Sequence, residues 1–508
     1  MATTTTPQNL FNLIGSAPGD RNAIVLPDSG IAVTYDALRT QVREVADALA
    51  AAGIGRDDRV AMAFPNGLPG IVCFLAASVA GTAAPLNPGY REEEFKFYLE
   101  DTNAKLLVLP PDGLDEARRA AGTNVPVAIA DMDESGHVTL SAPSGASGGA
   151  GAATPSGDDV ALVLHTSGST GRPKRVPLKH ANLCVSVANI IETYKLTADD
   201  VAMCVMPLFH VHGLVASTLS TLASGGTVVV PPKFNPLGFW RVVRDHGVTW
   251  FSAVPTMHQL LLAREKGAEK GDRGRLRFIR SCSAALAPDV MQAMETAFGV
   301  PVLEAYGMTE ASHQMASNPL PPGARKAGSV GPGTGVRISI MDKEGHHLES
   351  GAHGEIVIQG PNVITGYENN PEANASSFTD GWFRTGDQGF VDGEGYLTLV
   401  ARIKELINRG GEKISPREID EALKSHPAVA EAVAFGTPHK VWGEEVAAAV
   451  VLRDGESAAE AELQAHCRAH LADFKCPKTI HITDTIPRTA TGKIQRRLVA
   501  AAYAKDPA

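Results

Sequence analysis

The chain has 508 residues, a length that exceeds one ordinary compact core and favours two or more domains. Hydrophobic residues make up 44% of the chain and charged residues 20%, which excludes a protein that is disordered throughout. The formal net charge of −10 gives no general attraction to nucleic acid or to an anionic membrane. We expect neither as a partner, and we expect anionic ligands to meet a local site.

The cysteines and the chain ends indicate the compartment. No Cys-x-x-Cys pair occurs, which favours neither a disulfide framework nor a zinc site. The cysteines are Cys73, Cys184, Cys204, Cys282, Cys467 and Cys476. No basic segment followed by an apolar one opens the chain, and no apolar run reaches the ~18 residues that span a bilayer. We therefore expect a cytoplasmic protein, and the sequence leaves its oligomeric state open.

Helix and strand patterns alternate through residues 1–400. Apolar residues recur at helical spacing from Thr34 to Ala52, and a short buried strand is predicted from Arg59 to Ala63. Further strand-like runs, separated by helix-length segments, occupy 106–109, 160–164, 227–230 and 250–254. This alternation predicts a large N-terminal α/β domain with layered sheets and helices.

The pattern changes after Ala401. Ser415 fits a helix N-cap, Pro416 fits the first helical position and Glu418 would close a capping box. A strand over 432–435, a helix over about 458–471 and a basic tail follow. We predict a small α+β domain over 405–508, with a boundary over 401–404.

A loop dense in hydroxyls, glycines and cations follows the strand predicted over 160–164. Its candidate phosphate-binding residues are Thr166, Ser167, Gly168, Ser169, Thr170, Gly171 and Lys174. Glycines let backbone N–H groups approach a phosphate, hydroxyls donate hydrogen bonds, and Lys174 offsets charge. No Gly-Lys-Ser/Thr ends the glycine run, so this is not a P-loop NTPase motif. Composition alone fits a solvent-exposed loop equally well.

Residues 166–174 resemble the phosphate loop of the adenylate-forming superfamily, which includes acyl-CoA synthetases, luciferases and peptide-synthetase adenylation domains. Four more segments resemble that superfamily's motifs in its order: Tyr306-Gly-Met-Thr-Glu310, Trp382-Phe-Arg-Thr-Gly-Asp387, Arg402-Ile-Lys-Glu-Leu-Ile407 and Pro487-Arg-Thr-Ala-Thr-Gly-Lys493. Each motif alone could be structural. Their shared order identifies the chain as a member.

The resemblance implies a role for each nucleotide-site residue. Thr309 would contact phosphate and Glu310 would hold Mg²⁺, while Asp387 would bind the ribose hydroxyls with Arg402 nearby. Tyr306, Ala284 and Ala285 would also belong to the nucleotide site. Lys493 would bridge the substrate carboxylate and the phosphate during adenylation.

The resemblance also implies two orientations of a mobile small domain, which turns about Lys404. Lys493 would serve the first step, and Gly410 and Gly411 would face the second step, in which coenzyme A takes the acyl group. Ala401 departs from the glycine that relatives usually have before the hinge arginine.

This inventory suits the activation of a small carboxylic acid by ATP. A carboxylate is a weak nucleophile and repels the α-phosphate, so Mg²⁺, loop donors and Lys493 must offset negative charge. Coenzyme A then displaces AMP. Two other classes remain open: a carrier-loading adenylation protein, and a nucleotide-binding regulator that has lost catalysis.

The segment from Pro207 to Gly213 contains two histidines. If it is extended, His210 and His212 share one face and suggest a metal, but no third ligand lies nearby. A structural or pocket role is therefore favoured. The resemblance makes His210 the gate between the acyl site and the CoA tunnel.

Two positions bear on the acid. Ser283 stands where relatives have a pocket glycine, and His313 stands where they have a pocket proline. Both add bulk and hydrogen-bonding capacity, which suits a second carboxylate better than an apolar tail, and His210 would join them in binding it. The whole chain also closely resembles plant and fungal oxalate–CoA ligases. We predict oxalate as substrate, the alternative being a medium-chain fatty or aryl acid.

Overall fold

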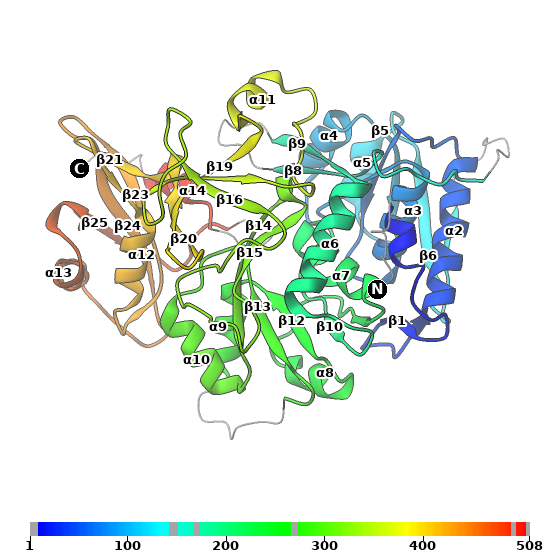
Figure 1. Ribbon diagram of the computed structural model, residues 1–508, viewed down its shortest axis with the longest axis horizontal. Coiled ribbons are helices and arrows are strands. Elements are labelled where there is room, and N and C mark those ends of the chain that lie inside the picture. The colour runs from blue at the N-terminus through cyan, green and yellow to red at the C-terminus, as the bar shows by residue number, and fades with distance from the viewer. Residues whose placement is uncertain (1–8, 142–150, 167–172, 266–272, 489–493, 504–508) are drawn as a thin grey trace. The chain divides into compact units, whose positions relative to one another are not determined.

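The computed structural model describes residues 9–141, 151–166, 173–265, 273–488 and 494–503 (Figure 1). The chain forms two compact units. The first contains residues up to Arg337 together with Ile358–Phe383, and the second contains Ile338–Val357 and the chain from Arg384 onward.

The first unit contains a largely parallel sheet with the strand order β7-β6-β5-β3-β4-β8-β9. Its strands are β3 (Arg59–Ala63), β4 (Thr82–Leu86), β5 (Ala104–Leu109), β6 (Val127–Met132), β7 (Val138–Ser141), β8 (Val160–Thr166) and β9 (Lys174–Lys179). The helices α2 (Tyr35–Ala51), α3 (Leu68–Ala80), α4 (Glu92–Asp101) and α5 (Asp115–Ala121) accompany it. Helix α3 packs against both α2 and the strands, and its side chains are almost all buried.

A second sheet in this unit has the order β15-β14-β13-β12-β10-β11-β1-β2. Its strands are β1 (Asn22–Val25), β2 (Ala32–Thr34), β10 (Val201–Met203), β11 (Thr227–Val229), β12 (Trp250–Ala253), β13 (Phe278–Ser281), β14 (Val302–Met308) and β15 (His313–Ser317). Neighbouring strands from β1 to β14 are parallel, and the edge strands β2 and β15 are antiparallel. An apolar core that includes Phe251, Met294 and Val302 packs on this sheet.

One helix precedes the strands of the second sheet in the chain, and the others lie between them. They are α1 (Leu10–Leu13), α6 (His180–Tyr194), the π-helix η1 (His212–Leu219), α7 (Ser220–Ala223), α8 (Phe239–Asp245), α9 (Pro255–Ala263) and α10 (Pro288–Phe298). A π-helix is uncommon and is frequent at functional sites. This one begins at a histidine of the candidate site.

A third sheet has the order β16-β17-β19-β18, with β20 paired to β19. Its strands are β16 (Arg337–Met341), β17 (Gly354–Gln359), β18 (Phe378–Thr379), β19 (Trp382–Val391) and β20 (Leu397–Arg402), and helix α11 (Pro371–Ser377) precedes β18. The fourth sheet is made of β21 (Ile407–Arg409), β22 (Glu412–Ile414), β23 (Val429–His439), β24 (Gly443–Leu452) and β25 (Thr479–Ile482). Helices α12 (Pro416–Lys424), α13 (Glu460–His470) and α14 (Arg496–Tyr503) belong to the same region.

These elements confirm the predicted fold class, a large α/β region followed by a smaller α+β one. The helix expected from Thr34 is α2, and the strand expected over 59–63 is β3. The predicted boundary over 401–404 lies inside the second compact unit, where it covers the end of β20 and the start of the 3₁₀ turn Ile403–Glu405. The boundary and the hinge stay predictions.

The expected capping box at Ser415 is wrong, although helix α12 begins where it was predicted. The Ser415 hydroxyl donates to the carbonyl of Val400 at 3.0 Å and makes no cap to its own helix. Glu418 accepts hydrogen bonds from Lys475 at 2.8 and 2.7 Å. Contacts distant in sequence therefore replaced the local ones.

All the cysteines lie among the described residues, and each thiol is buried and unbridged. No helix in the described ranges is long and apolar enough to cross a membrane.

Candidate active site

Glu310 lies in a short turn between two antiparallel strands of the second sheet. Strand β14 ends at Met308, the 3₁₀ turn η2 covers Thr309–Ala311, and β15 returns from His313. The Tyr367 hydroxyl donates to Oε1 of Glu310 at 2.8 Å, and the Thr166 hydroxyl lies 3.4 Å from the same atom. Among the described residues no Lys, Arg or His forms an ion pair with this carboxylate, which is 6% exposed. Its negative charge is therefore available to a cation.

The described ends of the phosphate loop meet at this turn. Thr166 ends β8 and pairs with Lys174, which begins β9. The Lys174 ammonium lies 4.4 Å from the centroid of the Tyr367 ring, a cation–π contact. Tyr367 therefore contacts both the cation of the loop and the anion of the turn. The candidate residues Ser167, Gly168, Ser169, Thr170 and Gly171 lie outside the described residues.

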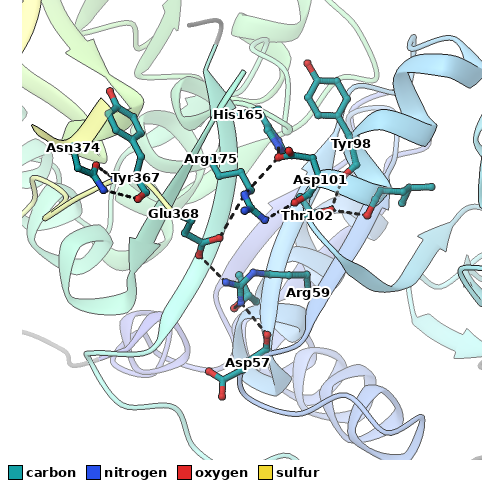
Figure 2. A network of polar contacts seen from close by, with 12 residues as sticks. Asp57, Arg59, Tyr98, Asp101, Thr102, His165, Arg175, Tyr367, Glu368 and Asn374 are labelled. Atoms are coloured by element: carbon teal, nitrogen blue, oxygen red, sulfur yellow. Dashed lines mark hydrogen bonds and ion pairs between the residues drawn. The ribbon is translucent and has the colours of Figure 1, made fainter. Parts of the chain in front are cut away.

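A buried ionic network fixes the strands that carry this loop (Figure 2). His165 Nε2 donates to Asp101 Oδ2 at 3.0 Å, and Arg175 Nε lies 3.5 Å from the same oxygen. Glu368 links Arg175 to Arg59, whose terminal nitrogen lies 2.7 Å from Oε1. Burial lowers the pKa of His165 although Asp101 raises it, so the neutral ring donates. His165 and Arg175 are the strand pair next to Thr166 and Lys174. Because side chains alternate along a strand, His165 and Arg175 hold the face opposite to that of Thr166 and Lys174.

The same network positions Tyr367. The backbone N–H of Tyr367 donates to Oδ1 of Asn374 at 2.7 Å, and Nδ2 of Asn374 returns a bond to the Tyr367 carbonyl at 3.0 Å (Figure 2). Glu368 N donates to the carbonyl of Arg175 at 3.1 Å. Tyr367 was missed in the sequence because it stands outside the recognised motifs.

A second polar cluster lies on strands β12 and β13 of the same unit. Ser252 and Arg280 are direct neighbours in the parallel register, so their side chains share one face of the sheet. His212 bonds to Ser283 Oγ through Nδ1 at 3.0 Å and to Ser252 Oγ through Nε2 at 2.6 Å. The structure thus joins the predicted pocket residue Ser283 to His212, for which the sequence favoured a structural or pocket role over metal binding.

His313 adjoins this cluster. Its ring packs edge-on against His212 at a centroid distance of 5.2 Å, and Arg280 lies 3.4 Å from its Nδ1. The backbone of His313 has φ 108°, which a proline cannot adopt. Gly307 permits this arrangement, because a Cβ there would lie 2.1 Å from the His313 carbonyl oxygen.

The backbone is strained on both sides of the cluster. Ser283 has φ 73° and Ser312 has φ 52°, values uncommon outside glycine. The Ser312 hydroxyl donates to the Asn362 carbonyl at 2.9 Å, and Ser186 donates to the Ser312 carbonyl at 2.7 Å. Such strain persists only where surrounding contacts fix it, and it concentrates at functional sites.

Arg280 was missed by sequence reasoning as a functional residue. It is fully buried, and its donors meet the Tyr194 hydroxyl at 2.8 Å, Ser252 Oγ at 2.9 Å and Gln314 Oε1 at 3.1 Å. One signal could have revealed it: an arginine that directly follows the apolar residues Phe278 and Ile279 of a short strand.

The segment around His210 does not have the extended form on which the metal interpretation depended. A turn leads from Pro207 into the π-helix, and the His212 N–H donates to Nδ1 of His210 at 3.2 Å. Gly213 allows the turn, since a Cβ there would lie 2.3 Å from the Pro207 carbonyl oxygen. No metal-binding group of three or more His, Cys, Asp or Glu occurs among the described residues. His210 is half-buried, and its role as a gate stays a prediction.

The remaining nucleotide residues of the first unit lie at strand ends. Ala284 and Ala285 are exposed just after β13, while Tyr306 on β14 and Thr309 are each 7% exposed. The ends of parallel strands are where α/β sheets bind ligands.

The second unit carries the predicted ribose and hinge residues. Asp387 on β19 pairs in register with Arg402 at the end of β20, and Arg402 Nε lies 2.8 Å from Asp387 Oδ1. Lys404 sits in the 3₁₀ turn Ile403–Glu405. Gly410 and Gly411 connect β21 to β22 with φ of 62° and 99°. Lys493 lies outside the described residues.

The chain is similar to proteins of one family along its whole length. The AMP-binding enzyme family matches residues 14–368, and the AMP-binding enzyme C-terminal domain matches 418–493. A probable CoA ligase CCL9 from Humulus lupulus is 48% identical, covering 98% of this chain and 97% of that protein. An oxalate–CoA ligase from Arabidopsis thaliana is 47% identical, covering 94% of each.

The structural comparison agrees with the sequence comparison. ATP-bound MatB from Rhodopseudomonas palustris has a TM-score of 0.88 and 33% identity, covering 98% of this chain and 99% of that one. The expected membership of the adenylate-forming superfamily is confirmed. The chain belongs to the AMP-binding enzyme family.

Proposed function

We propose that this protein is an oxalate–CoA ligase, which converts oxalate, ATP and coenzyme A into oxalyl-CoA, AMP and diphosphate. The observation that carries the choice of acid is the polar cluster in which Ser283 bonds to His212 and His313 packs on the same ring. The similarity to an oxalate–CoA ligase at 47% identity supports the same choice.

The first step joins the acid to AMP. A carboxylate oxygen attacks the α-phosphorus, the bond to the bridging oxygen breaks, and diphosphate leaves with both electrons. Lys174 and the hydroxyl of Thr166 stand at the described ends of the phosphate loop, where they would offset charge on the phosphates. Lys493 would do the same between the carboxylate and the α-phosphate.

The residues present fit a magnesium ion. Mg²⁺ binds oxygen ligands and usually takes one or two carboxylates together with substrate phosphates. Glu310 supplies one carboxylate without a cationic partner among the described residues. The hydroxyls of Thr166 and Tyr367 contact Oε1 of this carboxylate. When bound, Mg²⁺ offsets negative charge on the phosphates.

The second step forms the thioester. The sulfur of coenzyme A attacks the acyl carbon, the bond to AMP breaks, and the thiol proton goes to solvent. Gly410 and Gly411 would face this step after a turn about Lys404, and Asp387 with Arg402 would hold the ribose.

A cytoplasmic location also stays a prediction.

The alternatives fit the cluster less well. A medium-chain or aryl acid would bury an apolar tail against Ser283 and His313, at ~1–3 kcal/mol for each polar group left unpaired. A carrier-loading protein would release no free thioester with coenzyme A. A regulator without catalysis would release no diphosphate.

The test is a panel of acids with ATP, Mg²⁺ and coenzyme A, in which AMP and thioester are both measured. We expect oxalate to exceed acetate, octanoate and coumarate in kcat/KM, by ~10⁴ where an analogue lacks the second polar group. Faster turnover of octanoate or coumarate would contradict oxalate and leave the acyl-CoA synthetase assignment intact.

A further inference from the structure

Arg280 is a buried cation with no carboxylate among its described partners. Its side chain is 0% exposed, and it donates to Tyr194, Ser252 and Gln314. The thiol of Cys282 also interacts with it. Among the described residues no Asp or Glu forms an ion pair with this guanidinium. Burial raises the pKa of the Tyr194 phenol, which keeps it neutral as well.

A buried charge without a counter-charge is costly, and removing one partner of a buried ion pair is strongly destabilising. The cluster around Arg280 therefore lacks an anion that a ligand can supply. The direction of its hydrogen bonds shows where that anion would bind.

Arg280 sets the direction, because a guanidinium has only donors. It donates to Ser252 Oγ at 2.9 Å, and its Nη1 also lies 3.5 Å from Nε2 of His212. Because Nε2 faces this donor, it is the acceptor on the ring, so it takes the Ser252 proton at 2.6 Å and the ring proton of His212 lies on Nδ1. That proton donates to Ser283 Oγ at 3.0 Å.

The chain of hydrogen bonds from Arg280 ends at the Ser283 hydroxyl, which is left as a donor. Ser283 Oγ accepts from His212, so its own proton points away from the ring toward a further acceptor. Ser283 is only half-buried and is followed by the exposed Ala284, so a ligand can reach it. Arg280 also lies on the Nδ1 side of His313 at 3.4 Å, which favours the ring proton on Nε2 as a second donor.

We propose that Arg280, Ser252 and His212 form an ordered hydrogen-bond relay that makes Ser283 a donor to the second carboxylate of a short dianionic acid. Arg280 supplies the buried counter-charge, and Ser252 and His212 are positioning residues. This inference rests on the proposed function and names the residues that set its specificity.

A matched pair of serines tests the relay. Ser252→Ala removes the hydroxyl that bonds to both Arg280 and His212. Ser281→Ala removes the same atom from another fully buried serine, next to Arg280 on β13, whose hydroxyl has no hydrogen-bond partner among the described residues. We expect Ser252→Ala to raise KM for oxalate ~10-fold or more, with KM for ATP unchanged. Ser281→Ala should leave both within ~2-fold, because it breaks no hydrogen bond.

Changes at Arg280 test the charge. Oxamate replaces the second carboxylate of oxalate by a neutral amide, so the ratio of the two kcat/KM values reports recognition of that carboxylate. We expect Arg280→Lys to keep most of this ratio and Arg280→Met to reduce it ~10-fold or more. Thermal unfolding of each variant shows whether it folds, and if Arg280→Met does not, the serine pair decides.

The outcomes separate the inference from the proposed function. Equal effects of Ser252→Ala and Ser281→Ala on KM for oxalate would overturn the relay alone. A wild-type enzyme that prefers malonate or sulfoacetate would overturn oxalate, and the variants would then be measured on that acid. A wild-type enzyme that activates only monocarboxylates would overturn both.

Discussion

Two buried charges in the first unit stand in contrasting surroundings. Glu310 is an anion that contacts the hydroxyls of Tyr367 and Thr166, and Arg280 is a cation that contacts the neutral groups of Tyr194, Ser252 and Gln314. Neither forms an ion pair with another described residue. Each charge is thus left for a ligand of opposite sign, a cation at Glu310 and an anion at Arg280.

The two regions differ in how the chain builds them. Glu310 lies in a local turn within the recognised motif. Arg280 depends on parallel pairing with Ser252 and on the start of the π-helix at His212. The comparison therefore predicts that substitutions at Glu310 affect the nucleotide reaction, while substitutions around Arg280 affect the choice of acid.

The largest expected effect is that of Glu310→Gln. The substitution keeps the shape and removes the charge, so stabilisation of the phosphate charge should be lost, with adenylation ~10²–10³-fold slower. Exchange of labelled diphosphate into ATP measures this step. Oxalate binding, measured by calorimetry, should change little. A large loss of oxalate binding would show that the two regions are not separate.

Ser283→Ala and His313→Ala test the region around Arg280, where substitutions should affect the acid and not the nucleotide. Each removes one donor from the proposed acyl pocket, so kcat/KM for oxalate should fall ~10–100-fold. KM for ATP should stay within ~2-fold, because Ser283 bonds to His212 and His313 packs on the same ring. Steady-state kinetics with each substrate varied in turn checks both values. An equal rise in both KM values would contradict the division.

Tyr367→Phe should have a smaller effect on the nucleotide side. It removes the hydroxyl that donates to Glu310 at 2.8 Å and keeps the ring beneath Lys174. A hydrogen bond to a charged group is worth ~1.5–3 kcal/mol, so adenylation should slow about tenfold or somewhat more. Phe383→Leu, a buried ring 6.3 Å from Tyr367, is the control for general packing. Similar losses in both would indicate a packing effect only.

Substitution of His180, which lies outside both regions, should have the smallest effect on activity and a measurable effect on stability. Its Nδ1 accepts from Leu10 N at 3.2 Å and its Nε2 donates to the Ser78 carbonyl at 2.9 Å. Burial lowers its pKa from 6.5 to about 4. The unfolded chain therefore binds the proton first as the pH falls, so the stabilisation is complete above pH 6.5 and is lost toward pH 4.

His180→Gln removes this titration. Between pH 7 and pH 4.5 the wild type should lose about 2 kcal/mol more unfolding free energy than the variant. Denaturant unfolding at the two pH values measures the difference, and other titrating groups cancel. Parallel losses would show that His180 is protonated in the folded state.

The sequence predicted what depends on neighbouring residues. Helix α2, strand β3 and the start of helix α12 follow from local spacing and turn residues. The capping box was wrong because Lys475, distant in the chain, pairs with Glu418.

The partners of the two buried charges could not be predicted for the same reason. Tyr367 lies 57 residues from Glu310, and Ser252 lies 28 residues from Arg280. Strand pairing brings Ser252 to Arg280, and a contact of the segment before α11 brings Tyr367 to Glu310. The sequence proposed Ser283 and His313 as pocket residues and gave no sign of the buried Arg280 beside them.

The most direct test is the preference of the wild-type enzyme for oxalate over oxamate, measured as the ratio of their kcat/KM values. The two acids have the same size and differ in the charge of one end. If Arg280 and its relay recognise a second carboxylate, oxalate should be preferred ~100-fold or more. Equal use of the two acids would contradict the account.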